Sequence, residues 1–472
     1  MTRDQHPATA PTPSLTRSLG LRDMVLFNVV AVLSIRWLAT SASTGVGSLT
    51  LWVGAATLFF VPIGLAVVEL AARQPEEGGI YTWTKHALGD GHGFLCGWCY
   101  WVNNLLYYPS LLLATATIGT YAFGQGGGAL ESSWTYVLSA TLGLLWLAAI
   151  LNIVGAATGR WVQNLGAIAA YLPGVILVAV AGYGLAVHGP ANHFSLGALV
   201  PRVSRFSDLA LWSSITFAFS GIELCGVMAG EVKDPRNTLR RSVLIAAPLI
   251  AGIYIIGTTA MLVLVPSGDI NIVSGLLQGI QQGVGQTHHS LLFLVPVAAL
   301  LTVIGNLGQV GAWLSGPARV AFMIGLDKYL PRPFGRIHPR WGTPYVAILV
   351  EAAVGTLLLL VAVLGKGSTV EKAYLILLDT MILIYYIPYL YLFVTYLKLT
   401  GASPSETARG LKRRFVGVSG LTLTLAGMAL ATVPPADTQL WFFELKVLGG
   451  TLAFLILGGV LYRRGARAVT AG

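Results

Sequence analysis

Charged residues are scarce in this sequence. Asp, Glu, Lys and Arg make up 10% of its 472 residues, against about 25% in a typical soluble protein. Hydrophobic residues make up 55%. A soluble protein of this length would form about three domains, and so little charge would leave them with a largely apolar, adhesive surface. The shortage of charge therefore excludes a soluble enzyme or regulator and predicts an all-α protein that spans a membrane several times.

Cysteine and histidine are also scarce, with three and eight residues. Cys96 and Cys99 are spaced as a Cys-x-x-Cys pair, but they stand in an apolar, aromatic run without a second pair of ligands. The adjacent His288 and His289 cannot place both rings on one face of a helix. We therefore expect no metal or other cofactor, and a polytopic membrane enzyme is only a remote alternative.

Twelve apolar segments are long enough to be bilayer-crossing helices, which need about 20 residues each. They lie at about 22–47, 50–72, 91–123, 134–153, 161–187, 207–230, 241–265, 289–315, 344–364, 371–398, 414–433 and 440–462. Residues 21–465 then form one transmembrane domain between the terminal tails 1–20 and 466–472. The connection 266–288 can hold a short surface helix.

The basic residues punctuate the apolar segments rather than form one patch, so the net charge of +10 does not indicate a nucleic-acid partner. With a cytoplasmic amino terminus, most of the 29 Lys and Arg residues fall in cytoplasmic segments. The residues left outside are Arg202, Arg205, Lys366, Lys372 and Lys446. Because cytoplasmic loops are enriched in Lys and Arg, we expect both termini in the cytoplasm and a plasma-membrane location, the inner membrane of a bacterium.

Two spans contain features that favour an interrupted helix. The first carries Arg36 among hydroxyl residues, and the sixth carries Glu223 between Gly221 and Gly226. Spans one and six are the first helices of two five-helix units, about 21–187 and 206–398. Transporters built from inverted repeats have broken helices at such corresponding places. Close helix packing at the glycines and an interhelical hydrogen bond from Ser34 are the alternative interpretations.

Four motifs carry a resemblance to a known family. They are Pro75–Tyr81 after span two, Phe219–Glu223 in span six, Glu231–Thr238 at its inner end, and Asn306–Trp313 with the later Gly342-Thr343-Pro344. With these motifs the chain resembles the amino acid–polyamine–organocation transporters. The resemblance implies a LeuT-type fold of five plus five inverted helices and two additional helices at about 414–462.

The resemblance also implies a substrate held between broken helices one and six. An interrupted helix presents free N–H groups that favour a carboxylate and free C=O groups that favour an ammonium. Asn103 and Asn104 in span three join this site because lipid cannot solvate them. The expected substrate-binding residues are Ser34, Arg36, Thr40, Ser41, Asn103, Asn104, Phe219, Ser220, Gly221 and Ile222. Phe217 and Trp313 are the expected aromatic gates.

Glu223 and Asp379 are the expected coupling residues, because a carboxyl group inside a membrane marks a functional site by default. We hypothesise coupling to protons, or a proton-sensitive exchange. Arg36 could pair with a substrate carboxylate, with Glu223 or with Asp379, or could snorkel to an interface. Because a polyamine has no carboxylate to meet Arg36, the sequence favours an amino acid over a putrescine-like polyamine as the substrate.

Overall fold

The chain is almost entirely helical in the computed structural model, which describes residues 17–76, 78–124, 130, 133–154, 156–203, 208–285, 289–363, 370–401, 407–433 and 440–470. The helices up to the sixth span are α1 (Leu21–Val32), α2 (Arg36–Ala42), α3 (Ser48–Ala55), α4 (Val61–Arg73), α5 (Ile80–Leu88), α6 (Asp90–Ala122), α7 (Trp134–Ile153), α8 (Ala156–His188), α9 (Asp208–Phe217) and α10 (Leu224–Val227). The remaining helices are α11 (Pro235–Leu264), α12 (Gly275–Gly285), α13 (Leu294–Leu326), α14 (Tyr345–Val363), α15 (Val370–Thr400), α16 (Thr407–Ala431) and α17 (Leu440–Thr470).

Eight helical segments of the described chain are long and apolar enough to cross a membrane. They are Ser48–Arg73, Trp134–Ile153, Trp161–His188, Pro235–Leu264, Leu294–Leu326, Thr380–Thr400, Gly410–Ala431 and Val447–Arg467. The pair α1 and α2 forms a ninth candidate that bends by 43° at a short break. The chain is therefore a polytopic all-α membrane protein, as its composition predicts.

The centre of the bundle is formed by α6 and α13, which pack on each other. Residues 96–121 of α6 are buried on every face of the helix. A helix that is buried all round must be covered by other helices rather than by lipid. At the periphery, α17 has one largely apolar face exposed. Polar residues of α6 are consequently held inside the protein.

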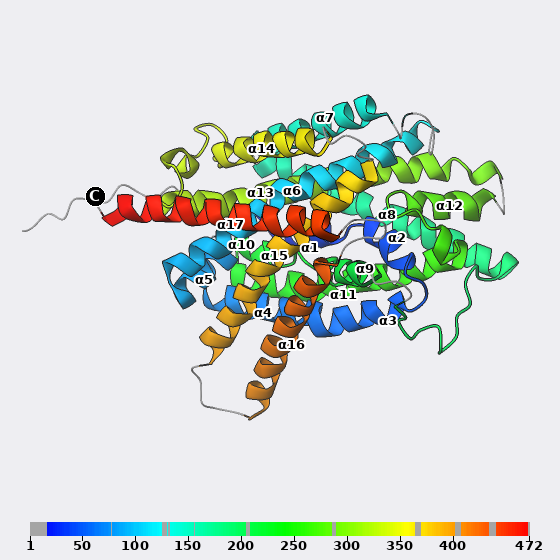
Figure 1. Cartoon of the computed structure of the whole chain (residues 1–472), viewed down its shortest axis with the longest axis horizontal. Helices are drawn as coiled ribbons and strands as arrows, with labels where there is room; N and C mark the ends of the chain where they lie inside the picture. The colour runs from blue at the N-terminus through cyan, green and yellow to red at the C-terminus, as the bar shows by residue number, and fades with distance from the viewer. Residues whose placement is uncertain are drawn as a thin grey trace, which may run out of the picture.

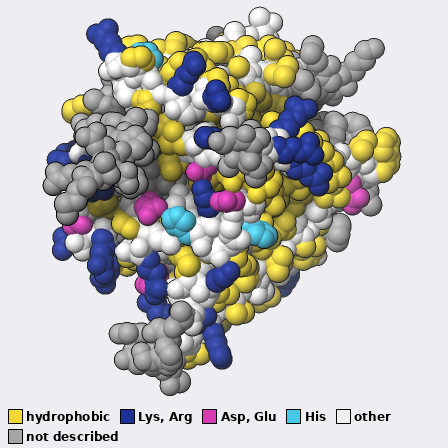
Figure 2. Space-filling model, turned by 90° about the vertical axis from the view of Figure 1, so that its left-hand side faces the viewer, with side chains coloured by type: hydrophobic (Ala, Val, Ile, Leu, Met, Phe, Trp, Pro, Cys, Tyr) yellow, Lys and Arg dark blue, Asp and Glu magenta, His cyan; other side chains and the backbone are white. Residues whose placement is uncertain are grey.

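One end of the bundle carries many basic side chains. The carboxyl end of α17 and the short helix α5 lie at the left-hand end in Figure 1, whereas α12 and the turn between α2 and α3 lie at the opposite end. Figure 2 looks onto the left-hand end and shows Lys and Arg side chains spread across it. We refer to this end as the basic end.

One helix agrees with the sequence expectation, and another is longer than expected. The surface helix expected within 266–288 is observed as α12. The eighth span was expected to stop at residue 315, but α13 continues to Leu326 through Gly316 and Pro317. A proline is tolerated there because neighbouring helices and side chains can satisfy the freed backbone groups. The extra turns place Arg319 inside the protein, where it is buried.

Candidate functional site

The first break lies at Leu33–Ile35, between α1 and α2. Leu33 is extended, with ψ of 111°, so the helix ends at Val32 and starts again at Arg36. The amide N–H of Ser34 donates to the hydroxyl of Tyr254, 3.1 Å away. This break falls among the residues that the sequence indicated, at the edge of the hydroxyl-rich segment.

The second break separates α9, which ends at Phe217, from the short α10, which starts at Leu224. Gly221 lies in the middle with φ of +123°, a conformation that disfavours any residue with a side chain. A Cβ atom at this position would lie 2.9 Å from Cζ2 of Trp313 and 3.0 Å from the carbonyl oxygen of Ala31. The glycine is needed both for the backbone turn and for the close approach of α1 and α13.

The hydroxyl group of Tyr254, on α11, joins the two breaks. Its oxygen lies 2.8 Å from the carbonyl oxygen of Val32 and 3.1 Å from that of Ala218. The side-chain amide of Gln309, on α13, donates to the carbonyl oxygen of Leu33 at 3.1 Å. Carbonyl groups freed by the interrupted helices are thus satisfied by side chains of two neighbouring helices.

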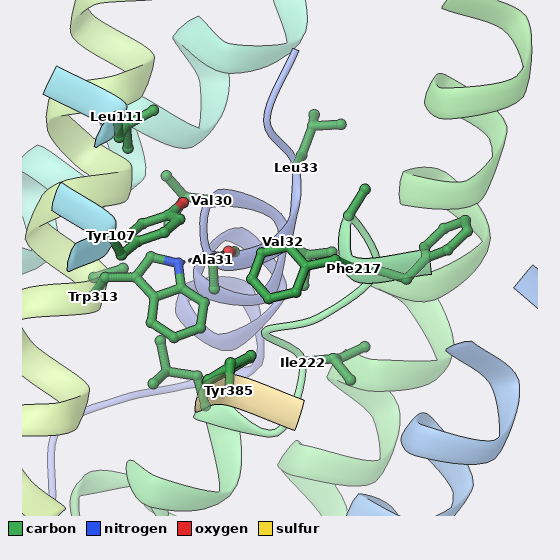
Figure 3. Packing of buried hydrophobic residues seen from close by; sticks show 14 of the residues in the cluster. Val30, Ala31, Val32, Leu33, Tyr107, Leu111, Phe217, Ile222, Trp313 and Tyr385 are labelled. Atoms are coloured by element: carbon green, nitrogen blue, oxygen red, sulfur yellow. Dashed lines mark hydrogen bonds between the residues drawn. The ribbon is translucent and has the colours of Figure 1, made fainter. Parts of the chain in front are cut away.

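The expected gates both contact the breaks. Trp313 donates its indole N–H to the carbonyl oxygen of Ala31 at 2.8 Å, and its ring packs on Tyr107 with centroids 5.2 Å apart. Phe217 packs edge-on against Trp37 and Tyr385. Figure 3 shows Trp313 and Phe217 on opposite sides of the residues at the end of α1. Whether these rings open and close a pathway stays a prediction.

Glu223 is fully buried at the end of the second break, directly before α10. Its carboxylate accepts hydrogen bonds from the hydroxyl groups of Tyr385 and Tyr389 on α15, and from Tyr100 on α6 at 3.2 Å. The N–H of Gly221 adds a fourth donor at 3.0 Å. All of its described hydrogen-bond partners are neutral groups. Donors of this kind can serve the ionised carboxylate, and the hydroxyl groups can also accept from the protonated acid.

Several buried polar atoms around the breaks have no hydrogen-bond partner among the described residues. They are the side-chain oxygen atoms of Ser34, Asn103, Asn104, Ser220 and Gln309. Asn103 and Asn104 lie on α6 between Tyr100, which donates to Glu223, and Tyr107, which packs on Trp313. Buried polar groups are rarely left unsatisfied, so a cluster of such atoms marks a place for water or a ligand. Three of these oxygen atoms belong to side-chain amides and can only accept.

Other expected site residues are directed elsewhere. The hydroxyl of Thr40 donates within its own helix to the carbonyl of Arg36, and Ser41 donates to that of Leu38. The ring of Phe219 stacks on Phe60, with centroids 4.6 Å apart. These three side chains therefore make intramolecular contacts in this conformation.

Ile222 and Arg36 are both buried, and Arg36 is only 4% exposed, so Arg36 is not at a membrane interface. Its guanidinium carbon lies 4.5 Å from the centroid of the Trp37 ring and 5.4 Å from that of Tyr107. A cation over aromatic rings is stabilised without losing its charge. The side chain of Asp379 lies outside the described residues, so its expected role is not tested.

A buried ion pair connects the segment after α10 to α13, on the side of the breaks that faces the basic end. Glu231 and Arg319 form a salt bridge, and the guanidinium of Arg319 also donates to the carbonyl oxygen of Ser315 at 2.5 Å. Both residues line a small pocket together with Asn152, Gln163 and Thr343. Leu19, in the segment before α1, donates its backbone N–H to the carbonyl of Glu231 at 2.9 Å.

A second group of charges fixes α5 to the end of α13. Lys85 forms a salt bridge of 2.6 Å with Asp327, which also accepts from the hydroxyl of Tyr81. Burial raises the pKa of Tyr81, and the neighbouring Asp327 raises it further, so the phenol stays protonated and donates. The backbone of Gly79, just before α5, packs so closely on Val227 that a Cβ would lie 2.7 Å from its nitrogen. The Pro75–Tyr81 motif therefore holds α5 against α10.

The sequence interpretation did not include Tyr254, Tyr385 or Tyr389. The only signal for the last two is their spacing of four residues in one span, which puts both hydroxyl groups on one face of a helix. Tyr254 stands in an apolar run without such a pattern. Among the described residues, no group of three or more His, Cys, Asp or Glu side chains could hold a metal ion.

Comparison with known proteins places these features in a family context. A family model described as "Amino acid permease" matches residues 19–456. An uncharacterized transporter of Legionella pneumophila is 28% identical over 450 residues, which cover 93% of this chain and 95% of that protein. The probable agmatine/putrescine antiporter of Lactococcus lactis is 24% identical over 90% of both chains. The serine/threonine exchanger of Bacillus subtilis is 26% identical over 65% of this chain and 67% of that protein.

Proposed function

Because the chain belongs to the amino acid permease family, we propose that it is a secondary transporter that moves an amino acid across the plasma membrane by alternating access. The observation that carries this proposal is the set of unpartnered, buried polar atoms between the two breaks. Three amide oxygens among them suit an ammonium group, and Arg36 suits a carboxylate. An amino acid carries both groups.

We further propose twelve spans in a LeuT-type arrangement. The eight long apolar helices and the bent pair α1–α2 would be completed by α6, α14 and the broken pair α9–α10. The first breaks of the two five-helix units then meet at Tyr254. The enrichment of Lys and Arg at the basic end supports a cytoplasmic location for that end, and hence for both termini.

Exchange is the mode that the relatives favour, because two of them are named as an antiporter and an exchanger. Glu223 is the proposed proton-sensitive group. It is buried among neutral hydroxyl groups, and none of these partners is a cation that would favour the ionised carboxylate. In an alternating-access cycle, such a carboxyl would exchange its proton with whichever side is open.

A polyamine transporter of the same fold is the second candidate, since one relative is named as an agmatine/putrescine antiporter. The acceptor-rich site suits one ammonium group, but the buried Arg36 would repel the second. Uptake of labelled alanine, glutamate, arginine and putrescine into proteoliposomes distinguishes the two, with and without a pH gradient. We expect saturable uptake of an amino acid. Saturable putrescine uptake that no amino acid inhibits would contradict the proposal.

The site itself is tested by removing one unpartnered acceptor at a time. Replacing Asn103→Ala or Asn104→Ala should raise the apparent KM about 10-fold or more, because a hydrogen bond to a charged group contributes about 1.5–3 kcal/mol. Asn152→Ala is the matched control. Asn152 donates to the carbonyl four residues before it at 2.8 Å, as Asn104 does at 2.7 Å, but it lies on α7. An equal rise in the apparent KM for Asn152→Ala would show that Asn103 and Asn104 do not bind the substrate.

A further inference from the structure

A second buried carboxyl group lies outside the site described above. Glu351, on α14, is fully buried, and neither of its carboxyl oxygens has a hydrogen-bond partner among the described residues. The hydroxyl of Tyr108 and the indole N–H of Trp101 are also buried and without a hydrogen-bond partner. Both interact with the Glu351 carboxyl. The carboxyl group, the phenol and the indole N–H are therefore collected at the interface of α6 and α14.

The position of this cluster relative to Glu223 is defined by α6. Tyr100 on this helix donates to Glu223, whereas Trp101 is turned by about 100° around the helix axis from it. Tyr108 follows Trp101 by seven residues, which is close to two turns, so both share one face of α6. One helix thus separates two buried carboxyl groups that face its different sides.

The two donors of the cluster suit both charge states of Glu351. As a carboxylate, Glu351 can accept from the Tyr108 hydroxyl and from the Trp101 N–H. As a neutral acid, it can donate to the Tyr108 oxygen. The elements that pack against α14 are α6, α7, α13, α15 and the 3₁₀ turn Arg332–Gly335. Among their described side chains, Tyr108 and Trp101 are the groups that interact with the carboxyl. An ionised carboxylate without a cation is costly in such a place, which favours binding of a proton.

A route from the basic end reaches this cluster. Phe334, in the turn Arg332–Gly335, is half-buried and packs edge-on against Trp101, with ring centroids 5.8 Å apart. Trp101 itself is 5% exposed and contacts Glu351. Two aromatic side chains in contact thus connect the half-buried turn Arg332–Gly335 to the carboxyl group.

We propose that Glu351 is a proton-binding site of this transporter, separate from Glu223, which exchanges its proton with the basic end through Trp101 and Phe334. The ligand is the proton itself, and the site needs no substrate to be occupied. Its existence does not depend on which amino acid or polyamine the central site carries.

Infrared difference spectroscopy of the protein in liposomes, between acidic and alkaline pH, tests the proposal directly. We expect a C=O band of a protonated carboxylic acid that is lost at alkaline pH. One component of this band should be present in the wild type and in Glu223→Gln and missing in Glu351→Gln, and a component that belongs to Glu223 should show the opposite pattern. Glu69→Gln is the matched control, because that carboxyl is 44% exposed and paired with Arg73. A Glu351→Gln spectrum identical to the wild type would overturn the proposal.

Tyr108→Phe keeps Glu351 and tests the site if Glu351→Gln folds poorly. It should leave the band in place but shift its frequency, since the hydroxyl no longer interacts with the carboxyl. An unchanged frequency would overturn the proposed geometry. In uptake measurements, Glu351→Gln should alter the dependence on pH at the basic end. A loss by the same factor at every pH, with an unchanged spectrum, would assign Glu351 a purely structural role.

Discussion

Glu223 and Glu231 stand eight residues apart on the same broken segment, and both are buried, but their partners differ. Glu231 forms a salt bridge with Arg319. The carboxylate of Glu223 accepts from three tyrosine hydroxyl groups and a backbone N–H. Removing either member of a buried ion pair leaves the other charge uncompensated, which is strongly destabilising.

The difference separates a fixed contact from a changeable one. The Glu231–Arg319 pair joins the segment after α10 to α13, and Leu19 is hydrogen-bonded to the same residue. It holds elements together near the basic end. Glu223 has neutral partners, so a proton can bind to it or leave it without breaking an ion pair. We therefore expect variants of Glu231 or Arg319 to affect stability and variants of Glu223 to affect transport.

The largest effect is expected from breaking the buried ion pair. Arg319→Met leaves Glu231 buried without a cation, which should lower the free energy of unfolding by about 3–5 kcal/mol. Thermal unfolding in detergent measures the loss. The double variant Arg319→Met with Glu231→Gln should recover most of it, because no unpaired charge remains.

The exposed pair Glu69–Arg73 is the matched control for this experiment. Its side chains are 44% and 46% exposed, and Arg73→Met should change the free energy of unfolding by no more than about 1 kcal/mol. Equal losses for Arg73→Met and Arg319→Met would show that burial does not distinguish the two pairs.

The sequence predicted the breaks but not the partners of Glu223. Arg36, Gly221 and Glu223 are exceptional in apolar spans, and this local signal is sufficient to locate an interrupted helix. Tyr385 and Tyr389 approach Glu223 from a helix more than 160 residues away, and only the packing of α15 on α6 brings them there. The burial of Arg319 was not predicted, because the continuation of α13 through Pro317 depends on tertiary contacts that the sequence does not show.

A smaller loss is expected at the second break. Gly221→Ala would force a side chain into a backbone conformation with φ of +123° and against Trp313 and Ala31. We expect a cost of about 3 kcal/mol from backbone strain and overpacking together. Gly252→Ala is the control, since a Cβ there meets no atom within 4 Å and the position is helical. It should be neutral or slightly stabilising. Comparable losses would remove the structural requirement for Gly221.

The smallest loss is expected from the group that joins the two breaks. Tyr254→Phe removes the hydroxyl that contacts Val32, Ala218 and Ser34, and should lower the free energy of unfolding by about 1–3 kcal/mol. Tyr136→Phe removes a hydroxyl that donates to the carbonyl of Ala116 at 3.2 Å, and should cost about 0.5–1.5 kcal/mol. The Tyr254 variant should also slow uptake, while the control should not. Normal uptake by Tyr254→Phe would show that the breaks need no common contact.

The pH dependence of substrate uptake into proteoliposomes, compared between the wild type and Glu223→Gln, tests the central claim most directly. The amide keeps the size of the side chain but cannot exchange a proton. We predict that uptake by the wild type changes with pH, and that uptake by Glu223→Gln loses this dependence while the variant remains folded. Full retention of the wild-type pH dependence by Glu223→Gln would contradict the assignment of Glu223 as the proton-sensitive group.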